Sequence, residues 1–153
     1  ITRAIIDFLP VLPREATSYI SSINNNEPVS RVDWIVGCSI IFSRIAFEKV
    51  GGFDEEYFLY SEDEDICWRL KNSGLNCLSY PSMLVTHQSG GTYGGIENEF
   101  ITICKLDSEL RLFSKKGVHP LLFKVLAFGC GLILAPFSKR GRTIFSWSLG
   151  ISK

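Results

Sequence analysis

The spacing of hydrophobic and polar positions predicts a strand followed by a short helix in the first well-patterned part of the chain. Apolar and β-branched residues fill the run from Trp34 to Phe42, and Gly37 interrupts it. Such a run is typical of a buried strand, and the glycine favours a bulge or a close backbone approach. A helix is predicted over 44–50, with the glycine pair 51–52 ending it.

The helix predicted over 62–73 has the most complete set of local features. Ser61, followed three residues later by Glu64, forms a capping box, and acidic residues fill the first turn. Lys71 lies in the last turn, and Gly74 follows at a position where a helix commonly ends. We therefore expect an amphipathic helix that begins with a cluster of carboxylates.

The next part of the chain alternates between extended and helical patterns. Short extended segments are predicted over 75–80 and 83–87, separated by Pro81, and a glycine-rich loop over 90–95. Apolar residues then recur at helical spacing and predict an amphipathic helix over 96–117. The expected fold class is therefore α/β.

Three parts of the chain are distinguished by their patterns. Residues 1–31 show no sustained period and are predicted to be a connector, and residues 32–119 hold the predicted strands and helices. In the tail, 120–153, the stretch 121–137 is apolar apart from Lys124 and is followed by basic residues. A spanning helix needs about 20 apolar residues, so this stretch is marginal. An interfacial or re-entrant segment and a helix covered by another part of the protein both stay open.

Composition excludes several classes of protein. The chain has 153 residues, of which 46% are hydrophobic, and its 16 basic and 16 acidic residues balance. These values describe one globular domain or less and argue against a nucleic-acid binder. Five cysteines without a CxxC pair favour a reducing, cytosolic environment over a disulfide framework or zinc site. Because the sequence starts at Ile1 without a methionine, we expect a fragment or a trimmed product.

Charge is unevenly distributed, and the acidic part is the best candidate for chemistry. Residues 48–65 hold eight of the 16 carboxylates, mixed with aromatic residues. Neighbouring carboxylates raise one another's proton affinity, whereas a helix N-terminus favours the anion. An ionised acid that still accepts a proton is what general-base catalysis requires. Two other interpretations stay open: a solvated first turn that compensates the helix dipole, and calcium binding, for which the EF-hand ligand spacing is missing.

Other catalytic motifs are absent from the sequence. It contains no GxSxG, P-loop or GxGxxG, so neither a serine hydrolase nor a nucleotide kinase is indicated. His87 ends an extended segment just before the glycine-rich loop. A single histidine in such a place is more often structural than a metal ligand.

Residues 32–87 combine seven features in one order. They are Gly37 and Arg44, the G-G-F-D turn at 51–54, Y-F-L-Y at 57–60, E-D-x-D at 62–65 with Arg69, a helix ended by glycine, the Tyr80-Pro81 pair, and His87. With these features the segment resembles the C-terminal half of the catalytic domain of family 2 glycosyltransferases, which have the GT-A fold. The likeness is greatest to the bacterial rhamnosyltransferase-like branch.

The resemblance implies an inverting sugar transfer, of hexosyl or rhamnosyl type, from a nucleotide-diphosphate donor to a glycan or lipid-linked acceptor. By match to the family's motif, Asp63 is the expected general base, and Glu62 is a neighbour that orients the acceptor or the base. Asp65 and Arg69 are expected to support the helix from behind the site.

The resemblance also implies positions for the acceptor and a metal. Trp34, Gly37 and Asp54 are expected to line the acceptor side, and His87 matches a position that in many members binds the metal or touches the diphosphate. The expected cofactor is a divalent cation, Mg or Mn, held mostly by the N-terminal half of the domain. Asp63-Glu64-Asp65 spells D-x-D, but at a helix start, whereas the metal motif ends a strand, so no metal role is transferred to it.

The donor-binding half has no counterpart in residues 1–31. We therefore expect the C-terminal half of a GT-A domain followed by a membrane-proximal helical tail, with little or no transfer activity on its own. The expected location is cytoplasmic, peripheral to or anchored in the inner face of the cell membrane. The alternative is a non-catalytic, membrane-associated interaction domain. In it, the acid-rich segment 48–65, called the acidic turn below, is a docking surface, and the basic tail binds anionic lipid.

Overall fold

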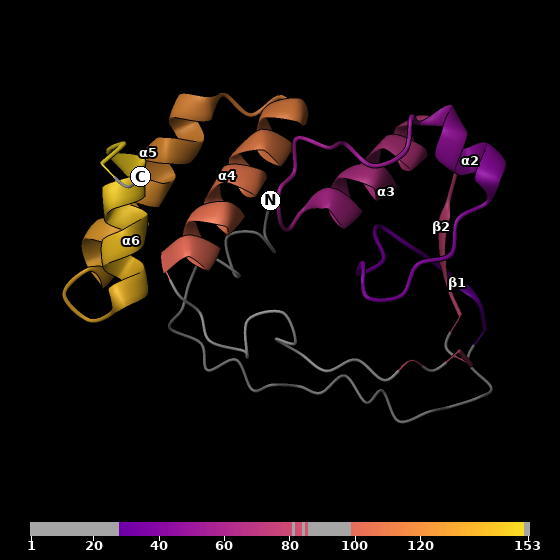
Figure 1. Cartoon of the computed structure of the whole chain (residues 1–153), viewed down its shortest axis with the longest axis horizontal. Coiled ribbons are helices and arrows are strands. Elements are labelled where there is room, and N and C mark those ends of the chain that lie inside the picture. The colour runs from indigo at the N-terminus through magenta and orange to yellow at the C-terminus, as the bar shows by residue number, and fades with distance from the viewer. Residues whose placement is uncertain (1–27, 81, 84, 86–98, 152–153) are drawn as a thin grey trace.

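The structure is a computed structural model, and it describes residues 28–80, 82, 83, 85 and 99–151 (Figure 1). The elements in chain order are β1 (Ser30–Val32), α2 (Arg44–Lys49), α3 (Glu62–Asn72), β2 (Cys77–Ser79), α4 (Glu99–Lys115), α5 (Pro120–Leu134) and α6 (Lys139–Ser148). Helices and a small sheet occur together, which is compatible with the predicted α/β class.

The first part of the described chain is built around α3. Strands β1 and β2 pair antiparallel, with Ser30 opposite Ser79 and Val32 opposite Cys77. Ile66 and Leu70 of α3 are buried in a cluster with Cys77 of β2. The apolar face of the helix therefore holds the sheet and the irregular segment between β1 and α2 in place.

The predicted strand from Trp34 to Phe42 is wrong, because this segment has no strand structure. Trp34 and Phe42 pack against the α3 cluster, whereas Ile41 is 86% exposed. A segment that buries some side chains on a helix produces the same apolar run as a strand buried in a sheet. The predicted close backbone approach at Gly37 is confirmed, since a Cβ there would lie 3.4 Å from the Cβ of Asp63.

Helices α2 and α3 confirm the predicted helices over 44–50 and 62–73. The chain leaves α2 through Gly51 and Gly52, whose φ angles of 78° and 72° suit glycine. The predicted capping box is wrong. Ser61 has a left-handed backbone with φ of 64°, and its side chain makes no capping hydrogen bond, because a capping serine needs an extended backbone.

Only part of the region after α3 is described. Strand β2 confirms the extended segment predicted over 75–80. In the second predicted segment, Met83 closes a turn by donating its backbone N–H to the carbonyl of Tyr80. The loop predicted over 90–95 lies outside the described residues.

The last three helices form the second part of the described chain (Figure 1). Helix α4 confirms the amphipathic helix predicted over 96–117, within the described residues 99–117. Its Leu106 is buried with Phe123 of α5 and Trp147 of α6. In the described part of the chain, no helix is both long and apolar enough to cross a membrane.

Two glycines allow α5 and α6 to pack closely. A Cβ on Gly131 would lie 2.6 Å from the backbone nitrogen of Phe145, and one on Gly141 would lie 2.3 Å from the backbone of Leu134. Real Cβ atoms do not approach so closely, so both positions require glycine for this helix pair. The tail is thus a tightly packed helical hairpin resting on α4.

Candidate functional site

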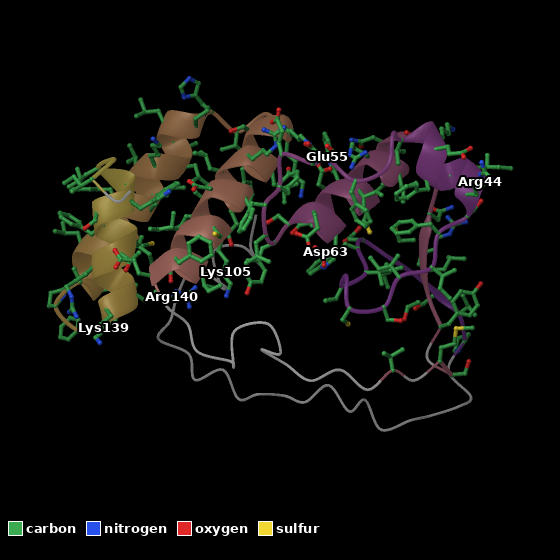
Figure 2. The ribbon with its side chains drawn as sticks, in the orientation of Figure 1. Arg44, Glu55, Asp63, Lys105, Lys139 and Arg140 are labelled. Carbon is green, nitrogen blue, oxygen red and sulfur yellow. The ribbon has the colours of Figure 1, made fainter. Side chains whose placement is uncertain are left out.

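Asp63, at the start of α3, is held by the segment that precedes α2. The backbone N–H of Gly37 donates to its Oδ2 at 2.7 Å, and the N–H of Glu64 donates to its Oδ1 at 2.8 Å. The side chain is partly buried, and Figure 2 shows it at the first turn of α3. A carboxylate fixed by two backbone donors has a defined orientation, which a positioned proton acceptor requires.

Glu62 lies beside Asp63 and has an oxygen without a partner. Its side chain is partly buried, and Oε2 is shielded from solvent but makes no hydrogen bond with any of the described residues. Buried carboxylate oxygens normally accept hydrogen bonds, so an unpaired one calls for an explanation. A donor group on a bound ligand would satisfy it.

Asp65 faces the interior and is fully buried. It accepts hydrogen bonds from the Tyr57 hydroxyl at 3.3 Å, Arg69 Nε at 2.7 Å and Lys115 Nζ at 2.7 Å. Arg69 also donates to the carbonyl oxygens of Val50 at 2.5 Å and Gly52 at 2.8 Å. These bonds tie α3 to the glycine turn after α2, so the geometry suits the supporting role expected for Asp65 and Arg69.

Asp54 is directed toward α4. Its Oδ2 accepts from Lys115 Nζ at 2.5 Å and from Arg111 Nη2 at 3.0 Å. The hydrogen bond from Lys115, followed by that from the backbone of Glu56, holds the pKa of the Asp54 carboxyl well below its usual range. The structure therefore brings Asp63 and Gly37 together, whereas Asp54 joins the ion pairs at α4.

Tyr57 lies within the same charged cluster. Its side chain is buried, and burial, together with the negative charge of Asp65, raises the pKa of its hydroxyl. Lys115 lies 4.9 Å from the centre of the ring, and Arg111 lies 5.5 Å from it. The Tyr57 ring therefore packs between the buried Asp65 and the two cations of α4.

Lys115 and Arg111 are the residues that sequence reasoning missed. Arg111 also forms an ion pair with Glu56, and the neighbouring Lys116 donates to Glu64 at 2.6 Å. The bonds of Lys115 to Asp54 and Asp65 cross 61 and 50 residues of sequence. The one indication of these ion pairs in the sequence is its charge distribution. Acidic residues are concentrated in 48–65, and basic residues are in excess after residue 110.

Trp34 is half-buried against the α3 cluster and lines an open cavity beside β1. The cavity has a volume of about 660 Å³, and Arg31, Asp33, Lys71 and Asn76 contribute its polar side chains. Asp63 is not among the residues that line it. Trp34, in the irregular segment before α2, and Asp63, in α3, therefore do not share a pocket of the described residues.

The described residues do not by themselves form the expected metal site. His87 lies outside the described residues. Within residues 28–80, 82, 83, 85 and 99–151, no three His, Cys, Asp or Glu side chains are grouped to hold a metal. Asp65, the last acid of the Asp63-Glu64-Asp65 run, is engaged by Arg69 and Lys115 instead.

One family model of glycosyltransferases matches part of the chain. Residues 17–89 match a family model described as the N-terminal domain of galactosyltransferase. This range includes both Gly37 and Asp63. No solved structure matches the chain.

The chain is also similar to part of several curated proteins. The chain is 37% identical over 86 residues to the N-acetylglucosaminyl-diphospho-decaprenol L-rhamnosyltransferase of Mycobacterium tuberculosis, covering 56% of this chain and 28% of the relative. It is 32% identical over 85 residues to the rhamnosyltransferase WbbL of Escherichia coli, covering 51% and 32%. A pre-mycofactocin glycosyltransferase of M. tuberculosis is 38% identical over 60 residues, covering 39% and 13%.

These matches define the class first: the chain is similar to glycosyltransferases. Within that class it resembles family 2 enzymes of the bacterial rhamnosyltransferase-like branch, which confirms the resemblance predicted from its sequence. The matched segment spans about a third or less of the length of these relatives.

Proposed function

We propose that this chain forms the acceptor-side part of an inverting glycosyltransferase with a GT-A fold, and that Asp63 is its general base. The observation that supports this most strongly is the hydrogen bond from Gly37 to Asp63, because it fixes the acid where the irregular segment meets the helix. In this proposal residues 1–31 connect to a donor-binding half, 32–119 carry the acceptor side, and 120–153 form the membrane-proximal tail.

In the proposed reaction, the oxygen of an acceptor hydroxyl attacks the anomeric carbon of the donor sugar. The bond from that carbon to the nucleotide diphosphate breaks, and the diphosphate leaves with the electron pair. The hydroxyl proton passes to the carboxylate of Asp63. The N–H of Gly37 holds Oδ2 at 2.7 Å, so the acid does not have to be reoriented when the hydroxyl arrives.

The neighbouring residues have supporting roles in the proposal. The unpaired, shielded Oε2 of Glu62 suits a second hydroxyl of the acceptor, which would orient the sugar. Trp34 offers an aromatic surface for a sugar ring in the cavity beside β1. Gly37 has no side chain, so its backbone can approach Asp63 closely. Arg69 ties α3 to the turn after α2, and Asp65 ties it to Lys115 of α4. That Asp54 lines the acceptor side stays a prediction, since the structure gives it ion-pair partners on α4.

The donor and the acceptor are proposed from the relatives. We propose a nucleotide-diphosphate sugar as donor, as the resemblance to family 2 glycosyltransferases implies. We propose a glycan or lipid-linked acceptor, because the name of one relative contains a diphospho-decaprenol compound. We place the reaction at the cytoplasmic membrane face. Mg or Mn, with His87 as a ligand, would stabilise the charge of the leaving diphosphate. The described residues do not form a metal site, so no step is derived through the ion.

The non-catalytic alternative receives less support from the acidic turn. Three of its carboxylates are paired with cations of α4, since Asp54 and Asp65 contact Lys115, and Glu64 contacts Lys116. An acidic docking surface would need these charges to face a partner. Calcium binding likewise lacks a cluster of ligands among the residues the structure describes.

The experiment that tests the proposed function is a transfer assay on the full gene product. It is incubated with a panel of nucleotide-diphosphate sugars and a polyprenyl-diphosphate-linked sugar, and the anomeric configuration of any product is determined by NMR. We expect transfer with inversion. A product with retained configuration, or no transfer from any donor in the panel, would contradict the proposal.

A further inference from the structure

Helix α5 has a continuous apolar face that no other described element covers. Its members are exposed and recur at helical spacing, and they are Leu121, Leu122, Val125, Leu126, Leu132 and Ile133. Ile133 is 69% exposed, and Phe137, just after the helix, is 84% exposed. Single exposed apolar residues are ordinary, but a contiguous set of this kind marks an interaction surface.

The opposite face of α5 already supplies the packing of the tail. Phe123, Ala127, Gly131 and Leu134 are buried. The helix is therefore apolar on both sides, and its exposed face is not needed to hold the three helices together. A helix that is apolar all round is normally buried or placed in lipid.

Basic side chains border this face. Lys139 and Arg142 are exposed at the start of α6, directly after Phe137, and Figure 2 shows Lys139 at the outer edge of the hairpin. Arg142 also donates to the carbonyl of Ala135 at the end of α5, which places its charge beside the apolar face. Eight Lys or Arg and no Asp or Glu follow Leu110 in the sequence. The charge of this region complements an anionic surface.

We propose that the exposed face of α5 docks on an anionic lipid bilayer, with Phe137 inserted and Lys139 and Arg142 at the headgroups. With 15 residues, α5 is about 22 Å long, shorter than the roughly 30 Å hydrocarbon core, so it lies along the interface. The hairpin of α5 and α6 keeps the apolar residues and the basic pair on one body, since Gly131 and Gly141 lock the two helices together.

The docked tail would also orient the candidate site, and this consequence rests on the proposed function. Helix α4 packs on α5 and α6, and its Lys115 bonds to Asp65 in α3, two residues after Asp63. Lipid binding by α5 would thus set the height of Asp63 above the bilayer. This arrangement suits an acceptor sugar that projects from a membrane-held lipid.

Vesicle co-sedimentation of the full 153-residue chain tests the docking without requiring catalysis. Vesicles of phosphatidylcholine with 30% phosphatidylglycerol are compared with pure phosphatidylcholine. We expect binding to the anionic vesicles at least tenfold tighter than to the neutral ones, and weakened by salt. Leu122→Gln combined with Leu126→Gln should lower the partition coefficient about tenfold or more. Lys139→Gln combined with Arg142→Gln should lower the partition coefficient on anionic vesicles mainly at low ionic strength.

Ile45→Gln is the control, because Ile45 is an apolar residue on α2 that is even more exposed, at 79%, than Leu122 and Leu126, at 53% and 56%. It should leave vesicle binding unchanged, and circular dichroism checks that every variant keeps its helices. Absence of binding to anionic vesicles, or an equal loss in the control, would overturn the docking. A dimer that dissociates in the Leu122/Leu126 variant, without vesicle binding, would assign the face to a second copy and also overturn it. Sugar transfer to a water-soluble acceptor would remain testable in each case.

Discussion

Lys115, the last residue of α4, donates a 2.7 Å hydrogen bond to Asp65, which is fully buried in the first turns of α3. The same ammonium group contacts Asp54 at 2.5 Å. This single side chain joins the C-terminal helices to the helix that begins with the candidate base. Stability of the junction and geometry of the site are therefore expected to depend on one another.

Lys115→Met should destabilise the fold by about 2 kcal/mol, because it leaves Asp65 buried with one cation fewer. Arg69 still contacts Asp65, which keeps the expected loss below that of an isolated buried pair. The measurement is the free energy of unfolding in urea. Lys116→Met is the control. It removes a more exposed pair with Glu64, so it should cost about 1 kcal/mol or less, and equal losses in the two variants would contradict the account.

The low pKa of Asp54 makes stability depend on pH. An aspartate whose pKa is lowered by folding contributes stability above its unfolded value of about 3.9, and this contribution is lost as the pH falls toward the folded value. The unfolding free energy of Asp54→Asn should therefore be below that of the native chain at pH 7, and the gap should narrow below about pH 4. Glu55→Gln changes an exposed residue of the same loop (Figure 2) and is the control. It should leave the dependence of the unfolding free energy on pH unchanged. A constant gap across the range would refute the assignment.

Substitutions at Gly37 should reduce transfer more than stability. A Cβ at this position meets Asp63 at ordinary contact distances of 3.4 and 3.5 Å, so alanine can fit the fold. It would, however, occupy space beside Oδ2 of the proposed base. We expect kcat/KM to be lower in Gly37→Ala than in the native protein and lower still in Gly37→Val. The melting temperature should change by only a few degrees in either variant. Full activity in the valine variant would show that the acceptor does not approach from this side.

The glycines between α5 and α6 provide a test of the tail. Gly131→Ala and Gly141→Ala each force a Cβ into the backbone of the other helix and should cost about 1–3 kcal/mol or more. Gly129 lies in α5, as Gly131 does, but a Cβ at this position would have nothing within 4 Å. Gly129→Ala should therefore be neutral or stabilising by up to about 1 kcal/mol, since alanine favours a helix. Thermal unfolding followed by circular dichroism distinguishes the three variants, and similar effects at all three sites would contradict the close packing.

Elements with local determinants could be predicted from the sequence. Helix α3 was found from its acidic first turn and apolar face, and α4 from its apolar period. The segment from Trp34 to Phe42 could not be assigned correctly, because the run of apolar residues does not reveal whether a helix or a sheet covers it. The capping by Ser61 failed because a left-handed backbone depends on the preceding turn, where Tyr60 also has a positive φ.

The candidate site was predicted in its residue types but not in its contacts. The motif identified Asp63, and the glycine at 37 indicated a close approach, yet nothing in the sequence paired these two residues, which are 26 positions apart. Arg111 and Lys115 were missed because ion pairs across 50 or more residues leave no local pattern. The ion pairs of Asp54 depend on the packing of α4 beside its loop, which the local sequence around Asp54 does not encode.

The most direct test of the central claim is the single-turnover transfer rate of Asp63→Asn in the full gene product, with donor affinity measured in parallel. Asparagine keeps a carbonyl oxygen that can accept from Gly37, so the fold should persist, but it cannot take the acceptor's proton. Glu48→Gln, at an exposed residue on α2, is the control. We predict a loss of about 10²–10⁴-fold in rate, with donor affinity and the control unchanged. A rate within a few-fold of the native protein would remove Asp63 from the role of base.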